Sequence, residues 1–428
     1  MVLRTYSLPY GKKCIDVHIN SEITLEQIVP RNIPVIRDCD LEITNAIRNA
    51  GEFAGLPLKI PSNMKIIITL NDKTRPVPND VLLPPLLREL VQRGANKKNI
   101  RFLIATGTHS PMKPEEFVKI INENILNEYQ FSSHDCDEDS NLVYKGNTKE
   151  GTQVFVNKLF DEADLTIVVG DIEPHHFAGF SGGVKSAAIG VCGRKTITQN
   201  HALLMDSKSC VGNFETNPLR QDIEEIGAII GVDLALNAIL NQKKEVLSVF
   251  FGNPFEVIRS GIAVIRKNLM IEVEKPFDIV ISSAGGYPKD INLYQAQKAL
   301  THASLFVKRG GTVILAAACE DGVGSESYLD FMNGVTSNKQ VIKKFENQGF
   351  FIGPHKAFQF ASIAEKIEYY LFSEIEGIIM KKLLIPKIID LDEFIKQKLS
   401  ELPKTARGVI LPFATASIPV TTGEPNEY

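Results

Sequence analysis

The sequence has few cysteines, and their spacing excludes two common uses of this residue. The six thiols lie far apart, with no Cys-x-x-Cys pair, so they fit neither a disulfide framework nor a thiolate zinc site. Basic runs long enough to follow a phosphate backbone are also missing, and the formal net charge is −4. This charge argues against a nucleic-acid partner and favours a small-molecule substrate.

Long apolar runs are absent as well. No stretch approaches the roughly 20 apolar residues that are needed to span a bilayer. The first residues, MVLRTYSLPYGKK, lack the apolar core of a signal peptide. We therefore expect a cytoplasmic protein with no membrane partner. The length of 428 residues is typical of two or three domains.

The sequence does contain short apolar runs that alternate with helical patterns. Strands are predicted at residues 65–70, 100–105, 165–169, 277–282, 312–316 and 375–380. Helices are predicted at residues 80–93, 114–122, 254–267 and 292–307. This alternation predicts an α/β fold of two domains, each a mostly parallel sheet flanked by helices. We place the domains at 1–270 and 271–428, and the last part of the chain, about 20 residues, could return to the first domain.

Polar or glycine-rich loops follow four of the predicted strands. They begin at Asp72, Thr106, Gly170 and Ala284. In open α/β sheets, ligands bind outside the carboxyl ends of the strands. We therefore expect these loops to contribute to one binding site.

The segment from 171 to 201 is rich in glycine and histidine and contains one candidate nucleophile. Gly179, Gly182 and Gly183 are expected to leave backbone amides exposed to a phosphate, and Lys185 could pair with it or act as an amine nucleophile. The P-loop pattern G-x-x-x-x-G-K-[ST] almost fits, but Val184 occupies the place of its second glycine. A P-loop-like phosphotransferase or hydrolase remains an alternative, as does a non-catalytic protein that binds a small anion.

Four histidines lie in or near these loops. His109 and His175 both follow strands, and two imidazoles facing one pocket would suit opposed proton transfers. His176 is expected to point elsewhere. His201 could bind a metal, but without an H-x-x-x-H partner or a nearby thiolate the protein supplies too few ligands, so a metal would need help from a cofactor. For any one of these residues, a structural role in a hydrogen bond is the simpler interpretation.

Arginine and lysine candidates also have two interpretations. Arg75 either lies on a solvated turn or, stiffened by Pro76, grips a carboxylate. Lys298 either belongs to an ordinary amphipathic helix or points toward a ligand, sharing a face with Tyr294 and Gln295.

Near the end of the second half, His355 and Lys356 follow a glycine and a proline. We expect them to cap a helix or to lie on the surface.

Six motifs in this order run through most of the chain. They are D-K-T-R-P-V-P at 72–78, A-T-G-T-H at 105–109, P-H-H-F-A-G-F-S-G-G-V-K at 174–185, T-x-x-x-N-H at 196–201, Y-Q-A-Q-K-A-L at 294–300 and G-x-H-K-A at 353–357. Together they resemble the lactate racemase family, whose members use a nickel-pincer nucleotide. The chain departs from the family in having no tryptophan, which some members place near the substrate, and in having Ile189 where proline is expected.

The resemblance implies specific roles for residues of this chain. Lys185 would hold the cofactor, nickel(II) pyridinium-3,5-bisthiocarboxylate mononucleotide, through a thioamide, and His201 would be the single protein ligand of nickel. His109 and His175 would be the paired acid/base residues. Cofactor contacts are implied for Asp72, Lys73, Thr74, Arg75, Gln295 and Lys298, and substrate contacts for Arg75, Tyr294 and Lys298.

The implied reaction is inversion at Cα of a 2-hydroxy acid, either lactate or a related 2-hydroxycarboxylate. One histidine would take the hydroxyl proton while hydride moves to the nickel-pincer nucleotide, and the resulting 2-keto acid would turn before hydride returns to its other face. The resemblance also implies two domains with the active site in the interdomain cleft. The partners would be the substrate and the enzymes that make the cofactor.

Overall fold

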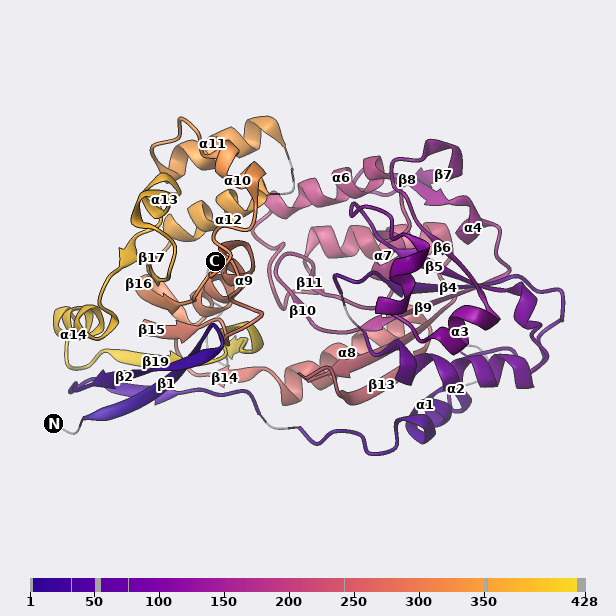
Figure 1. The fold of residues 1–428 in the computed structure, drawn as a ribbon, viewed down its shortest axis with the longest axis horizontal. Coiled ribbons are helices and arrows are strands. Elements are labelled where there is room, and N and C mark those ends of the chain that lie inside the picture. Colours follow the sequence, from indigo (N-terminus) through magenta and orange to yellow (C-terminus); the bar gives the residue numbers. More distant parts are fainter. Residues whose placement is uncertain are drawn as a thin grey trace. The chain divides into compact units, whose positions relative to one another are not determined.

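The computed structural model describes residues 3–31, 33–50, 55–75, 77–241, 243–349, 351 and 353–421. It confirms the α/β class, with two sheets flanked by helices (Figure 1). Pro76, which we expected to stiffen the Arg75 loop, lies outside the described residues. The chain divides into a central unit, Ile33–Ile265, and a terminal unit, Met1–Asn32 with Arg266–Tyr428.

The central unit is built on a six-stranded sheet with the order β13-β12-β9-β4-β5-β6. Its strands are β4 (Ile66–Asn71), β5 (Ile100–Ala105), β6 (Gln130–Ser133), β9 (Leu165–Asp171), β12 (Leu234–Leu240) and β13 (Val246–Gly252). Neighbouring strands are parallel except β13, which is antiparallel to β12. Every residue of β9 is buried, because helices and loops cover both faces of an inner parallel strand.

Helices of the central unit complete its core. They are α1 (Cys39–Arg48), α2 (Asn79–Gln92), α3 (Glu123–Glu128), α4 (Lys158–Asp161), α5 (Lys185–Ala188), α6 (Arg194–Ala202), α7 (Pro218–Ile230) and α8 (Pro254–Asn268). The first two pack on each other and share one apolar cluster with the strands. Helix α5 contacts β4, β9 and α7. Two small hairpins are added, β7 (Leu142–Asn147) with β8 (Gln153–Asn157) and β10 (Pro174–His175) with β11 (Gly179–Phe180).

The terminal unit has a second six-stranded sheet, which is parallel throughout. Its order is β18-β17-β16-β15-β19-β3. The strands are β3 (Thr24–Gln27), β15 (Phe277–Ser283), β16 (Val307–Ala316), β17 (Glu368–Phe372), β18 (Lys387–Ile388) and β19 (Arg407–Leu411). Two further strand pairs are β1 (Arg4–Tyr10) with β2 (Lys13–Ile19) and β14 (Ile271–Val273) with β20 (Pro419–Thr421).

Helices of the terminal unit follow its strands in turn. They are α9 (Leu293–Ser304), α10 (Glu326–Phe331), α11 (Asn338–Gln348), α12 (Pro354–Ala364), α13 (Gly377–Lys382) and α14 (Leu391–Glu401). Helix α9 packs on β15, β16 and α12. Across the described residues, no helix combines the length and apolar character that crossing a membrane requires.

Three sequence predictions differ from this fold. The helix predicted at 114–122 forms only a 3₁₀ helix at Pro114–Lys119. The strand predicted at 375–380 is wrong, since this apolar run forms α13, and the sheet instead takes the preceding E-Y-Y-L-F run as β17. A short apolar run does not distinguish a buried strand from a helix. The division at 1–270 and 271–428 also differs, because β3 pairs with β19 and so brings the N-terminal residues into the terminal unit. Strands β19 and β20 belong to the same terminal unit.

Candidate active site

The loops after β4 and β5 meet through an Asp–His pair. His109 Nδ1 lies 2.7 Å from Asp72 Oδ2, and the Thr74 hydroxyl donates to Asp72 Oδ1 at 2.6 Å. Burial opposes ionisation of Asp72, but the hydrogen bonds from His109 and Thr74 outweigh it, so the pKa of the carboxyl is lowered. The carboxylate is 4% exposed and the imidazole 44%. A buried anion therefore orients an accessible ring, an arrangement suited to acid/base chemistry.

The two basic residues of the same loop, Lys73 and Arg75, have different surroundings. The Lys73 amine is ion-paired with Glu116, so its charge is already compensated. Arg75 is exposed, and the loop turns back so that its backbone N–H donates to the Asp72 carbonyl at 3.0 Å. The Arg75 charge nevertheless influences the pKa values of the lysine and the histidine described below.

His175 lies in the small hairpin that follows β9. Its side chain is buried, and Nδ1 accepts the backbone N–H of Ala178 at 3.2 Å, which puts the proton of a neutral ring on Nε2. His176 stacks on this ring at 4.5 Å. The Phe177 ring contacts both imidazoles and also faces His201 at 5.3 Å. The aromatic ring thus brings the histidines of two distant motifs together.

The glycines of this segment do not form an exposed phosphate cradle, contrary to the prediction. Gly179, Gly182 and Gly183 are buried, and the Gly183 N–H donates to Asn237 Oδ1 at 2.7 Å. All three have positive φ angles, and a Cβ on Gly179 would lie 1.9 Å from the Asn213 carbonyl oxygen. Glycine is needed here for backbone conformation and close packing, and this weakens the P-loop alternative.

Lys185 begins α5, a four-residue helix behind the glycines. Burial and then the positive charges of Arg75 and Arg220 lower the pKa of its amine well below the ordinary value. The next residue is also fixed, since the Ser186 hydroxyl donates to Asn71 Oδ1 at 3.0 Å. None of the described residues hydrogen-bonds the Lys185 amine, so the helix presents a partly buried amine that favours the neutral, nucleophilic form.

His201 lies near the end of α6. Burial, followed by the charges of Lys185 and Arg75, lowers the pKa of His201 to about 3. Its Nδ1 lies 3.2 Å from Asn200 Oδ1, which favours the tautomer with a proton on Nδ1 and a lone pair on Nε2. A neutral imidazole oriented in this way is the form that binds a metal.

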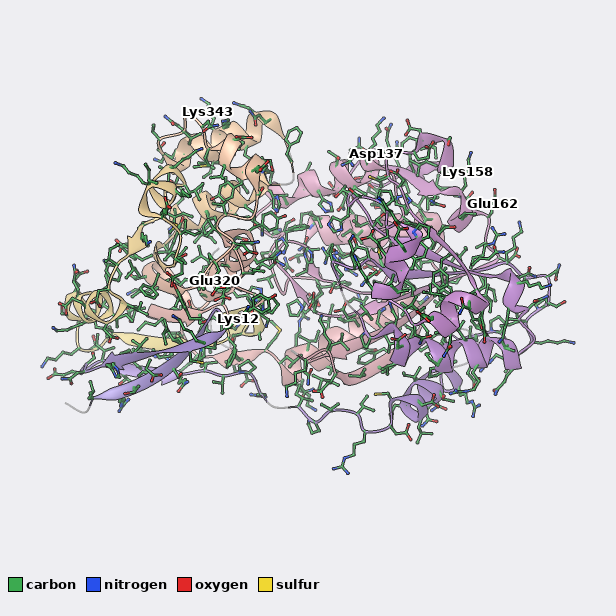
Figure 2. All side chains as sticks on the ribbon, viewed as in Figure 1. Lys12, Asp137, Lys158, Glu162, Glu320 and Lys343 are labelled. Atoms are coloured by element: carbon green, nitrogen blue, oxygen red, sulfur yellow. The ribbon has the colours of Figure 1, made fainter. Side chains whose placement is uncertain are left out.

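Clusters of three potential metal ligands are scarce in the described part of the chain. The one cluster found there is Asp135, Cys136 and Asp137, and Asp137 is exposed and ion-paired with Arg194 (Figure 2). His201 belongs to no such cluster. A metal at His201 would therefore need other ligands from a bound group, as the sequence indicated.

The candidates of the terminal unit lie on α9 and α12. Lys298 donates to Gln295 Oε1 at 2.9 Å, and the Tyr294 ring meets the edge of His355 at 5.7 Å. The prediction that His355 and Lys356 lie on the surface is wrong, whereas a capping role for His355 agrees with its Nδ1, which accepts the N–H of Gly353, the N-cap residue of α12, at 3.2 Å. His355 and Lys356 are 5% and 1% exposed, because α9, α10 and α11 cover α12.

Comparisons with known proteins identify the family. Residues 10–212 match the lactate racemase N-terminal domain, and residues 273–355 match the lactate racemase C-terminal domain. The lactate racemase of Lactiplantibacillus plantarum is 36% identical over 344 residues, which are 79% of this chain and 81% of the relative. That of Thermoanaerobacterium thermosaccharolyticum is 34% identical over 287 residues, 66% of this chain and 67% of the relative. The chain belongs to the lactate racemase family.

Solved structures support the same assignment. The lactate racemase apoprotein from T. thermosaccharolyticum matches with a TM-score of 0.87 and 27% identity, over 97% of this chain and all of that one. A Thermotoga maritima protein matches with a TM-score of 0.62 and 17% identity over 92% of this chain and all of that one, and shows the fold alone. Racemases are isomerases, so this lactate racemase family member is an isomerase.

Four residues that shape this lactate racemase family member's site were not found from its sequence. Asn237 and Arg220 hold the glycine segment. Asn200 contacts His201 and donates to Asp222 Oδ2 at 2.8 Å. The sequence signal for them is weak: an Arg220–Glu224 pair at i,i+4 is ordinarily a surface feature, and burial alone reveals its role.

Proposed function

We propose that this chain racemises or epimerises a 2-hydroxy acid of the lactate class, using a nickel-pincer nucleotide attached to Lys185. The observation that carries the proposal is the pairing of a partly buried amine of lowered pKa with a neutral imidazole at His201. His201 lacks the companion ligands of a protein-only metal site within the described residues. A group that brings its own metal ligands and forms a bond to an amine fits these two side chains.

The acid/base residues of the proposal are His109 and His175. Asp72 contacts His109 at Nδ1, so that Nε2 of His109 can accept the proton of a substrate hydroxyl. The backbone N–H of Ala178 donates to Nδ1 of His175, so that Nε2 of His175 can donate a proton. Inversion at Cα requires groups of this kind on opposite sides of the substrate.

Further contacts are proposed on the pattern of the family. When bound, the nickel-pincer nucleotide supplies the hydride acceptor and donor. Arg75, Tyr294 and Lys298 would bind the substrate, whose carboxylate suits a cationic partner. The remaining cofactor contacts would come from Asp72, Lys73, Thr74 and Gln295. The cofactor-making enzymes are the proposed partners.

The test is to co-express the chain with those enzymes and to record its intact mass and nickel content. We expect both a mass increase and nickel in the wild type and in Lys343→Arg, an exposed control (Figure 2). Lys185→Arg should have neither, because a guanidinium does not form the thioamide. The loaded wild type should also convert one lactate enantiomer into the other on chiral chromatography.

Two results would reject the proposal. One is a mass increase that persists in Lys185→Arg. The other is a wild-type chain with neither nickel nor added mass in cells where the same enzymes load a known lactate racemase. A P-loop-like hydrolase would instead bind nucleotide with magnesium, and a non-catalytic anion-binding protein would load nothing and turn over no enantiomer.

A further inference from the structure

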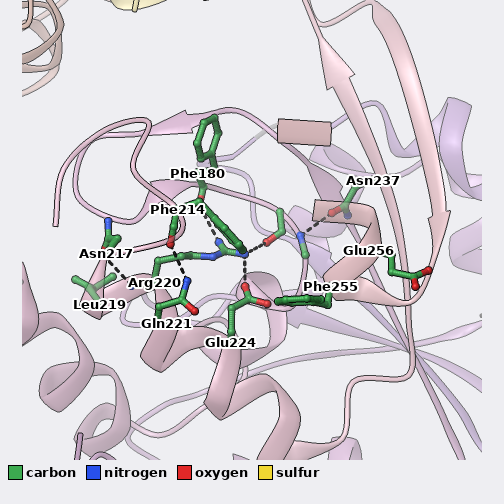
Figure 3. Close-up of polar contacts among 12 residues, drawn as sticks. Phe180, Phe214, Asn217, Leu219, Arg220, Gln221, Glu224, Asn237, Phe255 and Glu256 are labelled. Carbon is green, nitrogen blue, oxygen red and sulfur yellow. Dashed lines mark hydrogen bonds and ion pairs between the residues drawn. The ribbon is translucent and has the colours of Figure 1, made fainter. Parts of the chain in front are cut away.

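Arg220 is a buried cation on α7, close to the segment that precedes Lys185. Its side chain is fully buried, and a charge in such a place is costly unless it is paired and hydrogen-bonded. None of the six sequence motifs includes it, and it is not one of the proposed acid/base residues. Its contacts, drawn in Figure 3, indicate what it does.

The guanidinium holds two backbone carbonyls of the glycine segment. Nη1 donates to the Phe180 carbonyl at 2.8 Å, and Nη2 donates to the Gly182 carbonyl at 3.0 Å. Nη2 also pairs with Glu224 Oε1 at 2.5 Å, and the Phe214 ring lies 5.2 Å from the guanidinium carbon. Because a guanidinium is planar and rigid, it fixes the spacing of the groups that it bonds.

The same turn is held from its other side. The Gly183 N–H donates to Asn237 Oδ1 at 2.7 Å (Figure 3). A Cβ on Gly182 would lie 2.6 Å from the Ile172 side chain, and one on Gly183 would lie 3.0 Å from Ile258. The turn therefore has little room for a second conformation. It ends two residues before Lys185.

We propose that Arg220 is a positioning residue, which shapes the Phe180–Gly183 turn and thereby places the Lys185 amine for cofactor attachment. The inference rests on the proposed function only in taking Lys185 as the attachment point. A residue that merely filled the core could be replaced by an apolar side chain of similar volume. Arg220 instead donates two hydrogen bonds to carbonyl groups of one turn. These bonds require the planar shape and the charge of the guanidinium.

The charge gives the proposal a measurable consequence. Burial comes first and Arg75 and Arg220 come next among the causes that lower the pKa of Lys185, while Glu173 and Asp171 raise it. The nearby His201 ring is neutral and adds no charge of its own. Glu224 partly offsets the Arg220 charge. Removing Arg220 should therefore raise the pKa of Lys185, and neutralising Glu224 should lower it further.

The test uses the full apo chain and trace acetylation with acetic anhydride. Labelling of the Lys185 peptide is quantified by mass spectrometry against that of Lys343 over a range of pH. In Arg220→Gln, we expect the midpoint of the Lys185 profile to rise by about one pH unit. Labelling at pH values below both midpoints should then fall roughly tenfold, because in that range the neutral fraction of the amine falls tenfold for each unit by which its pKa rises. Arg220→Lys, which keeps the charge, should restore part of the shift.

Glu224→Gln provides the opposite prediction and keeps the test decisive if Arg220→Gln does not fold. In this variant, the midpoint of the Lys185 labelling profile should move to lower pH. The accessibility of the amine changes the plateau of the labelling profile and not its midpoint. A variant whose fold is merely looser would therefore not show the predicted shift of the midpoint. An unchanged midpoint in a folded variant of either residue would overturn the proposal, as would shifts of both variants in the same direction. Because no cofactor is needed, a normal midpoint shift with no cofactor attachment would reject the proposed function alone.

Discussion

Each unit of the molecule contains a lysine and a histidine whose pKa is lowered, but their surroundings differ. In the central unit, Lys185 and His201 lie among charged groups, and no described residue bonds the Lys185 amine. In the terminal unit, Lys356 donates to Gln297 Oε1 at 2.7 Å and to Gln359 Oε1 at 3.1 Å. Burial and then Lys298 lower its pKa well below the ordinary value.

The difference shows that a lowered pKa does not by itself mark a reactive group. The Lys356 amine is 1% exposed, bonded to two neutral amides and placed 5.0 Å from the centre of the Tyr294 ring. Its hydrogen bond to Gln297 links α12 to α9. Lys185 is partly exposed, and its neighbours Arg75 and Arg220 are charged. We infer that the two lysines differ in their hydrogen bonds, since two side-chain amides hold the Lys356 amine and no described residue hydrogen-bonds the Lys185 amine.

The largest expected effect comes from breaking a contact between two ionisable groups. Asp72→Asn should lower the turnover of lactate by the loaded enzyme by roughly 100-fold, because an amide N–H directed at Nδ1 would favour the His109 tautomer with its proton on Nε2. The measurement is the rate of racemisation by chiral chromatography. Thr74→Val keeps the Asp72 charge but removes the hydroxyl that donates to the carboxylate and lies 3.3 Å from His109 Nδ1, and it should lose less activity than Asp72→Asn. Equal losses in the two variants would contradict an orienting role for the charge.

Much of the central unit follows from its sequence, since β4, β5 and β9 are apolar runs that end in polar loops at the sheet edge. These loops include His109 and His175, whereas the roles of Lys185 and His201 are implied only by the resemblance to the lactate racemase family. Arg220 was beyond prediction, because its position on the helix does not reveal that the opposite segment turns its carbonyls toward it.

The terminal unit shows the other limit of prediction. Lys356 looks like a surface lysine in the first turn of a helix, and three further helices are needed to bury it. Strand β3 is a polar edge strand, with one buried residue in four. Its pairing with β19 spans almost the whole chain, and no local pattern contains that information.

The second prediction concerns the cost of keeping Lys356 neutral. The unfolded lysine binds a proton up to an ordinary pKa near 10.5, and the folded one does not, so stability rises with pH between the lowered pKa and that value. The difference in unfolding free energy between the wild type and Lys356→Met should grow by about 1.4 kcal/mol per pH unit in this window. Urea unfolding of the apo chain measures it, with Lys343→Met as the exposed control. A pH-independent difference would mean that the lysine is charged when buried.

The smallest effect is expected from His302, the buried histidine of α9 in the terminal unit. Burial lowers its pKa to about 4, against hydrogen bonds to the backbone of Ala414 and Ser417, so the folded ring stays neutral where the unfolded one is protonated. Its contribution to stability is present above pH 6.5 and is lost as the pH falls toward 4, at no more than about 1.4 kcal/mol per unit. His302→Asn should remove this slope and leave nickel loading intact, since His302 is neither the proposed nickel ligand nor the proposed attachment residue. A loss of nickel from this variant would mean that this buried histidine of the terminal unit also supports the cofactor site.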